Sequence, residues 1–198
     1  MSELSIHERL DRLYEEIQKR SFVNHRAPGG EVNFHIFDYE PEHELLIRDY
    51  VLKLILQLAK PENNLPTLEI NLFQMALDIL NERKFLDKAL QLESKKGKEA
   101  LHKALKPLLR PEKLSQIISE KLRDEHKLVL LTGIGEAWPL IRSHSILNNL
   151  HDTVDRLPLI VFFPGSYDGH ELSLFSTIHD DNYYRGECPE NGVNSFSS

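Results

Sequence analysis

The sequence predicts an α/β protein: a Rossmann-like, three-layer fold with a short, mostly parallel sheet and a large helical excursion between the second and third strands. Two continuous apolar runs, at residues 128–131 and 159–163, are typical of strands buried on both faces of a sheet. Because a segment with a helical pattern joins these runs, they predict a right-handed βαβ unit at the centre of the sheet. Alternation of apolar and polar residues over 32–37 and 67–72 predicts two further strands.

The first predicted helix begins at a capping box. Ser5 and Glu8 have the spacing at which the serine hydroxyl accepts a hydrogen bond from the backbone three residues on, while the glutamate reaches back. Apolar residues then recur with helical spacing, so we expect the helix to end near Arg20. Residues 24–30 are rich in turn formers and predict a loop.

A second helix is predicted over residues 41–59. Pro41 suits its first position, where the missing N–H is not needed, and Pro61 prevents the helix from continuing. Apolar side chains occupy nearly every side of this segment, so we expect a largely buried helix that crosses over the sheet.

Residues 73–126 predict the helical excursion, with breaks near 81–84, 94–97 and 110–111. The segment 81–127 has 13 Lys and Arg against 8 Asp and Glu, a net charge of +5, whereas the rest of the chain carries −12. Such a segment is either the solvated outer face of ordinary helices or a docking surface for an acidic partner or a phosphate backbone. The candidate basic surface consists of Lys95, Lys96, Lys98, Lys103 and Lys106.

The composition indicates a soluble, intracellular protein. The chain has 198 residues, 40% of them hydrophobic, which is enough for one α/β domain, predicted over 1–189 with a disordered tail at 190–198. No apolar run is long enough to span a membrane, and no signal peptide is recognisable. The single cysteine, Cys188, excludes an internal disulfide, which agrees with a cytoplasmic location. The net charge of −7 argues against general affinity for nucleic acid.

The segment Thr132-Gly133-Ile134-Gly135-Glu136 lies between a predicted buried strand and a helix, where phosphate-binding loops occur. It lacks the Gly-Lys-Ser/Thr ending of a Walker A loop and the third small residue of a dinucleotide fingerprint. Glu136 also places negative charge where a phosphate would bind. Conventional NTP hydrolysis is therefore not expected, and the alternative is a tight strand-to-helix turn that needs glycine for its backbone angles.

Arg142 and His144 are expected within the first two turns of the helix that follows. Because they are two residues apart, they point to different sides of a helix and do not act as a pair on one atom. Arg142 is a candidate clamp for a carboxylate or phosphate beside the turn. His144 is either a binding residue or a hydrogen-bonded, partly buried histidine.

Residues 164–169 are expected to form a turn that carries Tyr167 and Asp168. If the strands are parallel, Asp38, Glu136 and Asp168 emerge at one edge of the sheet, where open α/β sheets place their sites. Three carboxylates there could hold a divalent ion, and the alternative is that Asp168 only forms a turn with the following glycine. The sequence has no HExxH motif and no complete catalytic motif, so we expect no metal, no cofactor and no enzymatic activity.

Four segments carry motifs that are more specific together than separately: VLLTGIGE at 129–136, LIRSHSILNNL at 140–150, FFPGSYDG at 162–169 and DNYYR at 181–185. With residues 34–41 they span most of the chain, in order. The combination resembles the BrxB family of bacteriophage-exclusion (BREX) defence systems.

The resemblance implies a non-catalytic component of the assembly that methylates host DNA and blocks phage replication. Such proteins are encoded beside a PglZ phosphatase-like protein, a large ATPase and a DNA adenine methyltransferase. The implied role is an adaptor that binds the PglZ-like protein, with the ATPase and the methyltransferase as indirect partners. Two other interpretations stay open: a nucleotide- or metal-binding enzyme or sensor that uses the loops at 132–136 and 164–169, and direct DNA contact through the basic helices.

Overall fold

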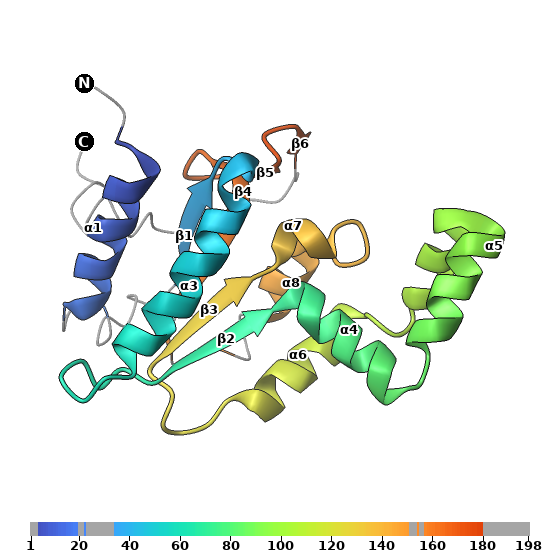
Figure 1. Ribbon diagram of the computed structural model, residues 1–198, viewed down its shortest axis with the longest axis horizontal. Helices are drawn as coiled ribbons and strands as arrows, with labels where there is room; N and C mark the ends of the chain where they lie inside the picture. The colour runs from blue at the N-terminus through green and yellow to red at the C-terminus, as the bar shows by residue number, and fades with distance from the viewer. Residues whose placement is uncertain (1–3, 20–21, 23–33, 151–153, 155–156, 180–198) are drawn as a thin grey trace.

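The computed structural model describes residues 4–19, 22, 34–150, 154 and 157–179, and within them six strands form one sheet (Figure 1). Four strands run parallel, in the order β2 (Thr67–Asn71), β3 (Leu128–Thr132), β4 (Leu159–Tyr167) and β1 (Phe34–Tyr39). β4 then continues and pairs antiparallel with β5 (Leu172–Leu174), which pairs with β6 (Ile178–His179). The predicted α/β class and mostly parallel sheet are confirmed, and the two apolar runs are its central strands.

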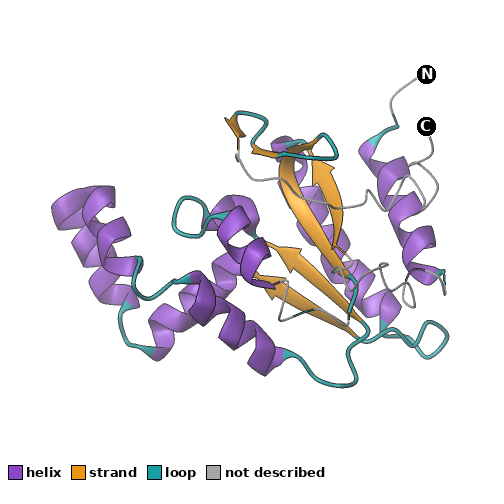
Figure 2. Ribbon diagram, turned by 180° about the vertical axis from the view of Figure 1, so that it is seen from behind, coloured by secondary structure: helices purple, strands orange, loops and turns teal. Residues whose placement is uncertain are grey.

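Helices cover both faces of the parallel strands and complete the three layers (Figures 1 and 2). One face carries α1 (Ile6–Gln18) and α3 (Glu44–Leu58), the latter preceded by the short 3-10 helix η1 (Pro41–His43). The other face carries α4 (Leu72–Glu82), α6 (Pro111–Lys121), α7 (Ile134–Ala137) and α8 (Ser143–Leu150). Figure 1 shows α5 (Leu86–Leu105) extending to the side, and α4, α5 and α6 form the predicted excursion between β2 and β3.

Two apolar cores lie on the two faces of the sheet, because successive side chains of a strand point to opposite faces. In β4, Ile160 and Phe162 pack into the core under α1 and α3, whereas Val161 and Phe163 pack into the core under α4, α6, α7 and α8. All four side chains are fully buried. A strand that contributes to both cores must be apolar at every position, which is the pattern found in the sequence.

α1 begins at the predicted capping box. The Glu8 N–H donates to Ser5 Oγ at 3.4 Å, and the Ser5 N–H donates to Glu8 Oε2 at 2.8 Å. The helix ends at Gln18, close to the expected end. It is fastened to α3 by the Tyr50 hydroxyl, which donates to the Leu10 carbonyl at 2.9 Å. The N-terminal helix is therefore an integral part of one outer layer.

The prediction that the helix after β1 is buried on nearly all sides is wrong. Its buried face consists of Ile47, Val51, Leu54 and Leu58. On another side Leu45, Leu52 and Leu56 are exposed at 72%, 60% and 71%. We call these three leucines the α3 stripe. Apolar residues on two sides of one helix look alike in a sequence, so the pattern did not reveal which side lacks a covering element.

The single helix predicted after residues 132–136, which we call the Gly turn, is interrupted. α7 ends at Ala137, and α8 begins at Ser143. Pro139 lies between them and has no N–H to donate to a continuing helix. Arg142 therefore precedes α8, where its carbonyl accepts from Ser145 N–H at 3.1 Å, and His144 lies in the first turn of α8.

Two other expectations are corrected along the chain. Residues 164–167, expected in a turn, belong to β4, and the turn begins only at Asp168, because the antiparallel partner β5 extends the strand. The predicted break at 94–97 is a kink inside α5 at Gly97, whose φ is +79°. The predicted breaks are confirmed at 81–84, where α4 ends, and at 110–111, where α6 begins.

Several expectations concern residues outside the described ones: the loop at 24–30, the strand residues 32–33, the motif at 181–185, Cys188 and the tail at 190–198. Within the described residues, no helix combines the length and the apolar character that crossing a membrane requires.

Candidate functional site

The carboxyl ends of the parallel strands meet at one edge of the sheet, as predicted. A cavity of about 280 Å³ lies at this edge, on the side of the sheet that carries α3. Its lining includes the ends of β1, β2 and β3 together with one side of α3, including Leu52 of the α3 stripe. This is the place where open α/β sheets usually bind ligands, so the groups that line it decide what the edge can do.

The Gly turn has a structural role at this edge. Gly133 has φ +69°, and a Cβ placed on it would lie 2.3 Å from Oδ1 of Asn71. The Asn71 side chain in turn caps α4, accepting from the Gln74 N–H at 2.9 Å. Thr132 Oγ1 donates to Glu69 Oε1 at 2.7 Å. The turn and the capping residue therefore fit each other, and glycine is required for the backbone angle and for the space.

Gly135 lies in α7, where an added Cβ would approach Pro164 Cγ to 2.9 Å. α7 is only four residues long. Gly135 therefore allows β4 to pass close to this short helix.

Glu136 is held by α3. Arg48 forms ion pairs with both Glu136 and Glu44, its Nε lying 3.2 Å from Glu44 Oε1. Glu44 also accepts from the Tyr39 hydroxyl at 2.7 Å. Burial, together with the negative charge of Glu44, raises the pKa of Tyr39 above its ordinary value. The contacts among Tyr39, Glu44, Arg48 and Glu136 join β1, α3 and α7, and so hold α3 on the sheet. The two carboxylates among them would also repel a phosphate group at this edge.

Asp38 joins three elements. Its Oδ1 lies 2.7 Å from Nη2 of Arg9 in α1, and its Oδ2 accepts from the Tyr167 N–H at 2.9 Å in β4. Tyr167 itself is buried. Both members of the ion pair are mostly shielded from solvent, their side chains being 24% and 21% exposed. Asp38 therefore fastens α1 and the far end of β4 to the end of β1.

Asp168 has the second of the two roles predicted for it, that of a turn residue. Its Oδ1 accepts from the backbone N–H groups of His170 at 2.8 Å and Glu171 at 2.7 Å. These two backbone hydrogen bonds, that of Glu171 first, lower the pKa of the Asp168 carboxyl. Asp38, Glu136 and Asp168 thus have separate partners, and in the part of the chain that the structure describes, no three His, Cys, Asp or Glu side chains gather in a way that could hold a metal ion.

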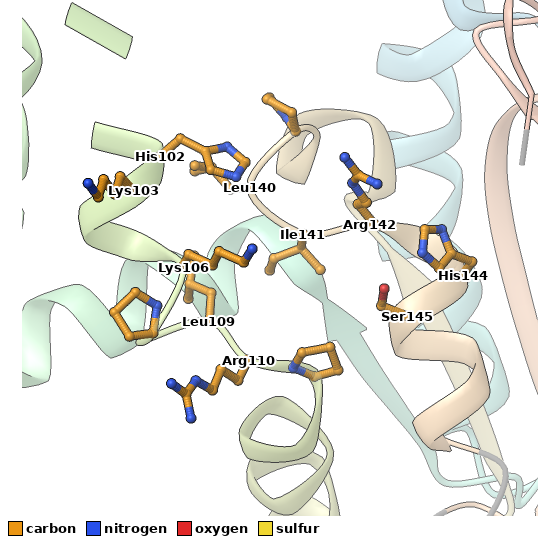
Figure 3. A pocket seen from close by; sticks show the side chains of 13 residues that line it. His102, Lys103, Lys106, Leu109, Arg110, Leu140, Ile141, Arg142, His144 and Ser145 are labelled. Atoms are coloured by element: carbon orange, nitrogen blue, oxygen red, sulfur yellow. The ribbon is translucent and has the colours of Figure 1, made fainter. Parts of the chain in front are cut away.

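Arg142 and His144 line a different and larger cavity, of about 490 Å³, away from the strand ends (Figure 3). Its opposite wall is the junction of α5 and α6, which brings Lys103 and Lys106 of the candidate basic surface to the same place. The other three lysines of that surface, at positions 95, 96 and 98, do not line it. The structure therefore unites two groups of candidates that the sequence placed far apart.

Two sets of residues were missed from the sequence. His102 and Arg110 line the cavity with Lys103 and Lys106, but only the packing of the α5–α6 junction against residues 139–145 shows it. The α3 stripe was missed because it was expected to be covered. For Arg110 the one local signal is Pro111, which marks it as the residue before a helix.

The family model described as "BREX protein BrxB" matches residues 68–187. A BREX protein BrxB of Bacillus cereus (strain H3081.97) is 42% identical over 183 residues, 91% of this chain and 95% of the relative. Another, from Escherichia coli O9:H4 (strain HS), is 36% identical over 178 residues, 89% of this chain and 88% of the relative. No solved structure matches. These matches confirm the resemblance seen in the motifs: the chain belongs to the BrxB family of BREX proteins.

Proposed function

We propose that this protein is a non-catalytic adaptor of a BREX phage-defence complex, which binds the PglZ phosphatase-like protein and thereby supports host DNA methylation and phage exclusion. Family membership supports the role in BREX defence. The observation that carries the adaptor role is the α3 stripe, in which Leu45, Leu52 and Leu56 are all at least 60% exposed. Since the assembly acts on host DNA, we place it in the cytoplasm.

The α3 stripe is presented on a firmly anchored helix. The opposite side of α3 is buried against the sheet, and Arg48 and Tyr50 tie the helix to α7 and α1. Complete burial of a leucine side chain contributes about 1.5–3 kcal/mol, so covering three leucines that are roughly two-thirds exposed contributes roughly 3–6 kcal/mol before the entropy of association. A rigid helix lowers that entropic penalty, because the docking residues are already ordered.

The charges around the stripe favour apolar docking. Arg48 pairs with Glu44 and Glu136, which leaves a single net negative charge, and the nearby Asp49 and Lys53 are of opposite sign. No strong field of one sign surrounds the leucines, so we expect the complex to depend little on ionic strength. The occupant that fits is a surface of the PglZ-like protein with apolar side chains at its centre.

The side-chain contacts at the edge of the sheet where the parallel strands end support an adaptor over a nucleotide- or metal-binding enzyme or sensor. Asp38, Thr132, Glu136 and Asp168 are each engaged in hydrogen bonds or ion pairs within the fold. A catalytic group needs to be aimed at a substrate, whereas these groups are aimed at other groups of the fold.

The test is co-elution of the purified protein with its PglZ-like partner on size exclusion, at low and at high salt. We expect one peak in both conditions for the native protein and for Leu90→Glu, a matched control because Leu90 is 56% exposed on α5. The double variant Leu52→Glu and Leu56→Glu should elute apart from the partner, because charges would be buried in an apolar contact. Its melting temperature should stay unchanged, since both side chains are exposed.

Separate elution of the native protein in every condition would refute the docking role. Co-elution of the Leu52→Glu and Leu56→Glu variant as efficiently as the native protein would refute the α3 stripe as the docking surface.

A further inference from the structure

We propose that the 490 Å³ cavity between the α5–α6 junction and the start of α8 binds a small ligand that carries two or more phosphate groups, such as a nucleoside polyphosphate. This basic cavity is separate from the α3 stripe and from the strand-end edge. Its walls come from residues 102–111 on one side and 139–145 on the other (Figure 3).

All the charged side chains that line the basic cavity are positive. Lys103, Lys106, Arg110 and Arg142 are cationic at neutral pH, and no Asp or Glu is found among the thirteen described residues of the lining. None of these four side chains forms an ion pair with another described residue. Like charges gathered in a concave site repel each other and focus a positive potential, which an anion relieves.

The backbone adds to this potential. α6 begins at Pro111 and α8 at Ser143, so two helix N-termini lie at the walls of the cavity. The N-cap of α6, Arg110, makes no side-chain capping hydrogen bond. Helix N-termini carry a partial positive charge. Glu112 in the first turn of α6 offsets this charge, whereas the first turn of α8 has no acidic residue, so the α8 end reinforces the lysines and arginines and favours an anion with several oxygen atoms.

The arrangement of the side chains suggests an inner and an outer set. In Figure 3 the Lys106 amine reaches from the α5–α6 junction toward Ile141, and the His102 ring lies beside Leu140. Lys103 and Arg110 direct their charged groups away from α8. A phosphate group between the two walls would meet the Lys106 amine first, and Arg142 would reach it from the opposite wall, while the other two charges contribute from the rim.

Size and net charge favour a small ligand over a long nucleic acid. The volume lies in the range of small-molecule sites, about 300–1,000 Å³. Outside residues 81–127 the chain carries −12, so a long polyanion would be repelled by most of the surface. A compact polyphosphate inside the basic cavity meets only the local positive field. The apolar side chains of Leu109, Leu140 and Ile141 offer a wall for the rest of a nucleotide.

The test is isothermal titration calorimetry of the full chain with inorganic triphosphate, ATP and a short DNA duplex. We expect triphosphate to bind with one site per chain and a Kd below about 1 mM, more weakly as salt is added. Equal affinity for ATP would show recognition of phosphate alone, and tighter binding of ATP would show that the apolar wall also contacts the nucleoside. Either result supports the proposal.

Matched variants locate the site. Lys106→Glu and Arg142→Glu should each weaken triphosphate binding about tenfold or more, because a charge-assisted contact becomes a repulsion. Lys95→Glu and Lys96→Glu change the same net charge outside the cavity and should leave the affinity within about twofold. Both sets are exposed, so melting temperatures should match the native protein. Lack of binding by triphosphate and ATP, binding of the duplex alone, or equal losses in both sets would overturn the proposal.

Discussion

Replacing Gly133 by alanine tests whether the Gly turn is a structural fit or a ligand loop. A non-glycine residue at φ +69° costs about 1–2 kcal/mol in backbone strain. The new Cβ would also lie 2.3 Å from Oδ1 of Asn71 and must displace that side chain. Losing the Asn71 cap of α4 costs about 1 kcal/mol more. Gly133→Ala should therefore lower the free energy of unfolding by about 2–3 kcal/mol.

The same geometry predicts coupling between the two residues. Asn71→Ala alone should cost about 1 kcal/mol, and in that background Gly133→Ala should cost only its backbone strain, about 1–2 kcal/mol. The double variant should then be more stable than the sum of the single losses by about 1 kcal/mol. Urea unfolding followed by circular dichroism measures all four proteins. Strict additivity, or a single loss below about 0.5 kcal/mol, would refute the fit between turn and cap.

Two more predictions concern side chains that join elements. Asp38→Ala should lower the free energy of unfolding by about 2–4 kcal/mol, since it removes the ion pair with Arg9 and the hydrogen bond from the Tyr167 N–H; in an Arg9→Ala background the loss should shrink, and an unchanged loss would contradict the pairing. Tyr39→Phe tests the raised pKa of Tyr39. Above its ordinary value near 10 the unfolded state loses this proton while the folded state keeps it, so stability falls as pH rises from there. Urea unfolding at pH 8, 10 and 11 should show a shallower fall in the variant, and equal slopes would disprove the assignment.

The sequence was sufficient to predict those elements whose local pattern is compatible with only one kind of structure. The runs at 128–131 and 159–163 are apolar at every position because each strand supplies both cores, and no exposed strand has that pattern. The capping box at Ser5 and the glycine of the turn at Gly133 are equally local, since each depends on atoms only a few residues away along the chain or on one backbone angle.

Features that depend on which elements meet could not be predicted. Whether Leu52 is covered depends on where the other helices lie, not on α3 itself. The extension of β4 from Gly165 to Tyr167 depends on β5, which pairs with these residues from the other side of a turn. The basic cavity forms only because the segments 102–111 and 139–145, which α6, β3 and α7 separate along the chain, lie on opposite sides of it. Each segment alone has an unremarkable charge pattern.

The position of β4 in the sheet has a consequence for biosynthesis. β1, at residues 34–39, lies beside β4, at residues 159–167, and both α1 and α3 rest on the core to which Ile160 and Phe162 contribute. Contacts so distant in sequence form late and slowly. While the ribosome is still making the excursion, β3 and β4 do not yet exist, so the face of α3 that is buried in the complete fold is exposed along with the α3 stripe. Until β3 and β4 have been made, the N-terminal third of the nascent chain therefore exposes apolar surface that favours aggregation.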